Sequence, residues 1–119
     1  MIKQLLLVGA GGALGSVARY LLTLLFGSMA FCGHWAIFVA NVVGSFLIGL
    51  AMGWCSGGAY LFVAVGFCGG FTTFSTVSAQ ALSLIEAQRY APAAAYIVGT
   101  VLLSLLAVFL GIWLAHRVK

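Results

Sequence analysis

The chain has 119 residues, of which 65% are hydrophobic and 5% are charged, and its formal net charge is +4. A water-soluble domain carries about 25% charged residues, so this composition excludes a soluble globular fold. The apolar residues run continuously instead of alternating with polar ones, which excludes a transmembrane β-barrel. A bilayer-spanning helix needs about 20 mainly apolar residues, so the length accommodates four spans with short connections. We therefore expect an all-α membrane protein with one integral membrane domain over residues 1–119.

The charged residues are too few to form a basic patch, so the positive balance reflects membrane topology and excludes nucleic acid as a partner. The basic residues outside the predicted spans are divided between the two sides of the membrane, with Lys3, Arg117 and Lys119 on one side and Arg89 on the other. This bias is small and is compatible with insertion in either orientation. The three cysteines show no CxxC spacing, so we expect buried free thiols.

The first predicted span covers residues 4–26 and is rich in small residues at its centre. Gly11 and Gly15 form a GxxxG pair, which allows another helix to approach closely. Arg19 follows within the same span. Two interpretations stay open for this arginine: it extends to the membrane interface, or it binds backbone carbonyls or creates a positive potential at an aqueous vestibule.

The second predicted span covers residues 34–54 and carries Asn41 at about one third of its depth. Ser45 lies one turn further along the same face and begins a stripe of small residues with Gly49 and Gly53. Asn41 is interpreted either as an interhelical hydrogen-bonding residue or as an amide donor facing a pore.

The third predicted span, residues 60–85, contains the most unusual stretch of the chain. Glycine and hydroxyl residues crowd its centre, and both disfavour a plain helix. We expect two half-helices separated by a non-helical break at about residues 69–75. Irregular backbone at membrane depth persists only where it is buried in protein or lines a watery cavity. A polar stripe follows on one helical face: Thr72, Thr76, Gln80 and Ser83.

The fourth predicted span covers residues 93–116. Tyr96, Thr100 and Ser104 recur every four residues and form one polar edge on an apolar helix. These hydroxyls either bond carbonyls of their own helix or line a path. The chain shows no internal inverted repeat, so a transport path between inverted halves requires a second copy.

Three segments together resemble the Fluc (CrcB) family of fluoride channels: GGALGSVARY at residues 11–20, ANVVG at 40–44 and GGFTTFST at 69–76. The resemblance extends over all four spans. It implies an antiparallel, dual-topology homodimer in a bacterial inner membrane, with two fluoride pores and a structural Na⁺ buried at the dimer interface. It also implies passive export of fluoride, which protects the cell from fluoride toxicity.

The resemblance also implies roles for individual residues. Asn41 matches the pore asparagine, Phe74 the first phenylalanine of the aromatic pore box, and Arg19 the vestibule arginine. The backbone carbonyls of Gly69 and Thr72 match the Na⁺ ligands. The whole predicted fluoride path consists of Asn41, Phe74, Thr76, Val77, Ser78, Tyr96, Thr100 and Ser104.

Two positions depart from the family pattern. Val77 stands where the second phenylalanine of the pore box is usual, and Gln80 stands where a glutamate is common. Valine has no aromatic quadrupole, whose positive edge can face an anion. The sequence therefore allows two interpretations of the working unit. The chain forms a homodimeric channel, or it is one half of a heterodimer whose partner supplies the missing ring.

Other functions are disfavoured by the residues that the chain lacks. A proton-coupled exporter of the small multidrug resistance type needs a carboxylate at membrane depth, but the single acid, Glu86, lies at a span end. A non-transporting scaffold subunit, whose polar stripes serve only helix packing, is the other alternative. An enzyme is not expected, because one glutamate and two distant histidines provide no set of nucleophile, base and acid.

Overall fold

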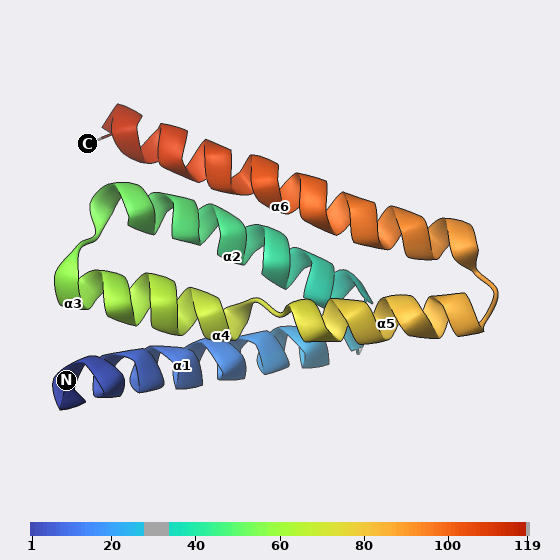
Figure 1. Ribbon diagram of the computed structural model, residues 1–119, viewed down its shortest axis with the longest axis horizontal. Coiled ribbons are helices and arrows are strands. Elements are labelled where there is room, and N and C mark those ends of the chain that lie inside the picture. The colour runs from blue at the N-terminus through green and yellow to red at the C-terminus, as the bar shows by residue number, and fades with distance from the viewer. Residues whose placement is uncertain (28–33, 119) are drawn as a thin grey trace.

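The computed structural model describes residues 1–27 and 34–118, and the secondary structure it describes there is helical (Figure 1). The elements are α1 (Ile2–Gly27), α2 (His34–Trp54), α3 (Gly57–Tyr60), η1 (Leu61–Cys68), α4 (Gly69–Phe71), α5 (Phe74–Glu86) and α6 (Tyr90–Val118). Four stretches are long and apolar enough to cross a membrane: Ile2–Phe26, His34–Trp54, Gly57–Glu86 and Tyr90–Val118. The predicted all-helical class with four membrane-length helices is confirmed.

The helices form two close pairs. Helix α1 packs against η1 and α4, and α2 packs along α6. Figure 1 shows α2 next to α6, with α1 beside the chain segment from α3 to α4, and both termini at the same end of the molecule. The two members of each pair run in the same direction, because successive spans alternate in direction and the pairs join the first span to the third and the second to the fourth.

Glycine makes both close pairs possible. A Cβ atom added at Gly15 would lie 2.1 Å from the backbone oxygen of Phe67, and one added at Gly111 would lie 2.3 Å from that of Phe46. Real Cβ atoms do not approach backbone so closely, so any larger residue would push the helices apart. Small residues at helix contacts are the usual means by which membrane helices approach each other, since lipid supplies no hydrophobic driving force between them.

The third membrane-length stretch is the least regular. Its first half includes a π-helical segment, η1, which is followed by one short α-helical turn, α4. Thr72 and Thr73 then adopt extended backbone conformations, with φ/ψ of −91°/158° and −155°/121°, before α5 begins at Phe74. The stretch therefore passes from α-helix to π-helix and back to α-helix, and then through two extended residues, before it continues as α5.

Large apolar side chains cover much of the outer surface, especially along α1 and α6. The buried positions are mostly small: alanines from α2, η1, α5 and α6 dominate them. This distribution is typical of a protein whose outer surface faces hydrocarbon. Two polar side chains of the described residues, Asn41 and Thr100, are buried on the inner faces.

Candidate functional site

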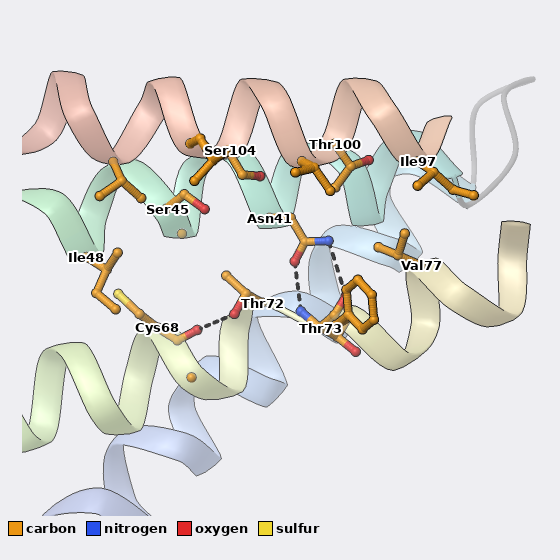
Figure 2. Close-up of a pocket in the computed structure, with 16 residues that line it drawn as sticks. Asn41, Ser45, Ile48, Cys68, Thr72, Thr73, Val77, Ile97, Thr100 and Ser104 are labelled. Atoms are coloured by element: carbon orange, nitrogen blue, oxygen red, sulfur yellow. Dashed lines mark hydrogen bonds between the residues drawn. The ribbon is translucent and has the colours of Figure 1, made fainter. Parts of the chain in front are cut away.

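A cavity of about 390 Å³ lies between α2, α6 and the stretch from α4 to α5 (Figure 2). It follows about three turns of α6, from Ile97 to Val108. Its walls are mainly apolar, but polar side chains from three spans converge on it: Asn41, Ser45, Thr72, Thr73, Thr100 and Ser104. An apolar cavity with a few convergent polar groups is the usual form of a binding site.

Asn41 holds the extended residues of the third span in place. Its Oδ1 accepts the backbone N–H of Thr73 at 2.8 Å, and its Nδ2 donates to the Thr73 carbonyl at 3.2 Å. The side chain is 7% exposed. An amide carries two N–H donors, so one of them remains for other partners. The Asn41 side chain thus provides the backbone of Thr73 with the hydrogen bonds that a continuous helix would supply. Asn41 also lines the cavity, as Figure 2 shows.

The extended residues release two backbone carbonyls from their helical partners. In a continuous α-helix, the Thr73 N–H would bond the Gly69 carbonyl and the Thr76 N–H would bond the Thr72 carbonyl. The Thr73 N–H bonds Asn41 instead, and the Thr76 N–H bonds the Oγ1 atom of Thr73 at 3.3 Å. The Gly69 and Thr72 carbonyls, which are the predicted Na⁺ ligands, have lost these donors.

Arg19 contacts the same irregular stretch from α1. Its Nε donates to the Gly70 carbonyl at 3.1 Å, the group that Phe74 N–H would bond if the helix continued. Of the two interpretations of Arg19, the structure therefore shows a bond to a backbone carbonyl. The positive charge lies beside the irregular stretch, where it favours negative charge nearby.

Thr100 and Ser104 place hydroxyls on the opposite wall of the cavity, on α6. Their Oγ atoms are buried and have no hydrogen-bond partner within the described part of the chain. Buried polar groups are normally paired, so each of these hydroxyls has hydrogen-bonding capacity for a ligand or water. The sequence allowed these hydroxyls either to bond carbonyls of their own helix or to line a path. In the described part of the chain, the hydroxyls of Thr100 and Ser104 do not bond their own helix.

The remaining predicted path residues divide into two groups. Phe74 and Val77 line the cavity, but Phe74 is 76% exposed whereas Val77 is 4% exposed. Thr76 accepts a hydrogen bond from Thr73 Oγ1, and Ser78 donates to the Phe74 carbonyl. Neither Thr76 nor Ser78 lines this cavity.

Tyr96 lies at a second cavity, of about 450 Å³, formed by the beginning of α2, the end of α5 and the first half of α6. It donates its hydroxyl proton to Gln80 Oε1. The two cavities lie on different faces of α6, since Ile97 and Thr100 line the first while the adjacent Tyr96 and Gly99 line the second.

Four polar or polarisable cavity residues were not among the predicted path residues: Ser45, Cys68, Thr72 and Thr73. Of these, Thr72 was predicted only as a Na⁺ ligand, through its backbone carbonyl. The sequence contains a signal for Ser45, because it lies one turn beyond Asn41 on the same face. No local pattern identifies Cys68 or Thr73, whose positions depend on how the third span folds.

The irregular stretch of the third span offers a cation backbone carbonyls and hydroxyls as oxygen donors. The described residues contain no cluster of three or more His, Cys, Asp or Glu side chains that could hold a metal. The released carbonyls of Gly69 and Thr72 are hard oxygen donors of the kind that bind hard cations. They fit an alkali ion better than a transition metal, which prefers nitrogen or sulfur.

Comparison with known proteins gives a consistent result. The family described as CrcB-like protein, Camphor Resistance (CrcB), matches residues 6–112. Proteins named Fluoride-specific ion channel FluC are similar over nearly the whole length. The protein from Caulobacter sp. (strain K31) is 43% identical, and that from Phenylobacterium zucineum (strain HLK1) is 44% identical, each alignment covering 98% of both chains. A protein from Thermus thermophilus is 44% identical, over 92% of this chain and 93% of its own.

Proposed function

Because the chain belongs to the CrcB family, we propose that it is a fluoride-selective ion channel. Two relatives that are 43% and 44% identical are named as fluoride-specific ion channels, and each alignment covers almost the full length of both chains. In this proposal, the protein lets fluoride leave the cell passively across the bacterial inner membrane and so lowers its toxicity. A channel provides a path and no chemical conversion, so no enzymatic reaction is assigned.

The observation that carries the proposal is the set of neutral donors around one cavity. Thr100 and Ser104 have buried hydroxyls without a partner in the described chain, and Asn41 has an amide N–H beyond the one that bonds Thr73. Fluoride is small and strongly hydrated, so a path must replace its water with hydrogen-bond donors. Hydroxyl and amide groups can do so without a fixed positive charge.

The neutral character of these donors suits conduction. A site must bind an ion strongly enough to admit it and weakly enough to release it. Phe74 adds the positive edge of an aromatic ring at the rim of the cavity. Arg19 contributes a positive potential from the neighbouring helix without lining the cavity. An anion would thus pass from a region of favourable potential to a series of weak donors.

We propose that the Gly69 and Thr72 carbonyls hold a structural Na⁺ in the assembled channel. Both carbonyls are released from helical hydrogen bonds by the extended residues of the third span, which supports this assignment. The bound ion would supply positive charge and link two subunits through two carbonyls from each. Asn41 and Thr73 contribute by keeping the two carbonyls free of competing N–H donors.

We further propose that the working unit is an antiparallel dimer of two copies in opposite orientations. The small charge bias is compatible with both orientations. Phe74, at the cavity rim, is 76% exposed in the single chain, and a second copy would cover it. The alternative is a subunit of a heterodimer, favoured by the valine at position 77, whose partner would supply the second aromatic ring.

The test is fluoride efflux from liposomes that contain only this purified protein, followed with a fluoride electrode and compared with chloride. We expect rapid, fluoride-selective efflux that is lost in Asn41→Asp and Phe74→Ile. Phe109→Ile is a matched control, because Phe109 is also exposed, at 63%, but lies on α6 away from the cavity. A well-folded protein that releases no fluoride would refute the homodimeric channel and favour the heterodimer or a scaffold.

A further inference from the structure

The second cavity, of about 450 Å³, is separate from the donors on which the proposed channel rests. Asn41, Thr100 and Ser104 line the first cavity, no described residue lines both, and the two cavities lie on different faces of α6. Figure 1 shows that α5 ends and α6 begins at the end of the molecule away from both termini. The second cavity lies at this end, where the chain reaches the membrane surface.

Arg89 supplies a positive charge at the opening of the second cavity. It lies in the connection between α5, which ends at Glu86, and α6, which begins at Tyr90, so it is placed at the level of the lipid head groups. Among the described residues only its backbone is bonded, to Leu84 and Ala93, and its guanidinium forms no ion pair with Glu86. The planar guanidinium can therefore donate two parallel N–H bonds to a phosphate.

From this opening the cavity follows one face of α6. Pro92, Ala95, Gly99 and Leu103 line it and recur every three or four residues. At about 1.5 Å per residue, the distance from Pro92 to Leu103 along the helix is about 16 Å. One leaflet contributes half of a hydrocarbon core of about 30 Å, or about 15 Å. The groove is therefore as long as the part of an acyl chain that lies within one leaflet.

Apolar side chains from two other helices form the walls of this groove. Trp35 and Phe38 of α2 line it with their rings edge to face, at 5.8 Å between centroids, and Leu84 of α5 lies opposite α2 in the lining. Gly99 keeps the floor open, because a Cβ atom added there would meet no atom within 4 Å. The cavity thus combines one cationic opening with a long apolar interior, which matches an amphiphile better than a free anion.

We propose that the second cavity binds one acyl chain of an anionic phospholipid whose phosphate is held by Arg89. The charge at the opening is complementary to the phosphate, and the apolar groove accommodates the chain. Basic pockets between membrane helices are typical sites for anionic head groups. A zwitterionic lipid carries its own ammonium group beside the phosphate, so it gains less from the guanidinium. The bound lipid would contact the beginning of α2, the end of α5 and the beginning of α6.

The test is native mass spectrometry of the purified protein, titrated with phosphatidylglycerol or with phosphatidylcholine of identical acyl chains. Arg89→Gln removes the charge. Its matched control is Arg117→Gln, because Arg117 lies in the last turn of α6, 5.0 Å from the centroid of the Trp113 ring, and does not line the cavity. Gly99→Leu fills the groove. Its control is Gly9→Leu, because a Cβ atom at Gly9 also meets open space but Gly9 lines neither cavity.

We expect the parent to bind phosphatidylglycerol about tenfold more tightly than phosphatidylcholine, as one hydrogen bond between charged groups implies. Arg89→Gln should lose this preference, Gly99→Leu should lose the tightly bound lipid of either kind, and both controls should match the parent. An equal loss of preference in Arg89→Gln and Arg117→Gln would show a non-specific attraction to the basic protein and would overturn the site.

The same variants distinguish two other occupants. Glycerol phosphate, which carries the phosphate without acyl chains, should not displace phosphatidylglycerol at equal concentration, and displacement would assign the cavity to a free phosphate. A change in the ratio of monomer to dimer in Gly99→Leu with unchanged lipid binding would assign the cavity to a second copy of the chain. Either result would overturn the lipid site, and neither depends on whether the protein conducts fluoride.

Discussion

Replacement of Asn41 by leucine tests whether one side chain holds the extended residues of the third span. Leucine has nearly the same shape as asparagine but cannot hydrogen bond, so Asn41→Leu removes both bonds to Thr73 at little cost in packing. The Thr73 N–H and carbonyl then lose their partners beside a largely apolar cavity. The helix must either leave them unsatisfied or admit water to them.

The size of the effect follows from these two groups. An unsatisfied buried backbone group costs about 1–3 kcal/mol. Thr73 is half-buried and lies beside a cavity that water can enter, so the lower end of this range applies to each group. We therefore expect Asn41→Leu to lower the free energy of unfolding by about 2 kcal/mol, twice the lower limit for one group.

The assay is reversible unfolding of the purified protein in mixed micelles with increasing dodecyl sulfate, followed by far-ultraviolet circular dichroism. Ser45→Ala is the matched control, because Ser45 lines the same cavity on the same helix and lacks such a bond to the extended residues. The free energy of unfolding of Ser45→Ala should lie within about 0.5 kcal/mol of that of the parent, as is usual for substitutions that remove no paired buried group. An Asn41→Leu protein as stable as Ser45→Ala would refute the reasoning.

Three further outcomes are expected. Gly15→Ala should destabilise the protein, because the new Cβ would lie 2.1 Å from the Phe67 carbonyl oxygen. Gly9→Ala meets open space and should be neutral or stabilising by up to about 1 kcal/mol. Unfolding in mixed micelles compares the two variants. Val77→Phe should raise fluoride efflux from liposomes by restoring an aromatic edge beside the cavity, and unchanged efflux would argue against a role for position 77. Replacing Na⁺ by N-methylglucamine should lower the melting temperature and the efflux together, and identical values in both cations would contradict the structural Na⁺.

Composition and motif by themselves determined the coarse features of this protein. Four membrane-length helices follow from continuous apolar stretches, because backbone groups in hydrocarbon must be satisfied within each segment. The local glycine and hydroxyl content of residues 69–76 was enough to single out the third span as unusual. The family, too, could be identified from short motifs, and the match over residues 6–112 confirms it.

Which polar groups meet depends on how the spans pack against each other. The polar stripe predicted on the third span placed Thr76 and Gln80 on one face, but Thr76 is bonded within the N-terminal cap of α5 whereas Gln80 bonds Tyr96 of α6. Ser78, also predicted to lie on the path, bonds its own helix. Hydroxyls have several possible partners within reach, and periodicity alone does not choose among them.

The same holds for the residues that shape the candidate site. Asn41 bonds a residue 32 positions away, and Arg19 bonds a carbonyl 51 positions away. These two contacts decide which carbonyls leave the helical pattern, and they form only when three spans pack together. A local pattern records which residues can hydrogen bond, whereas the packing of the spans decides which of them do, because the bond requires atoms from distant segments to lie within about 3 Å of each other.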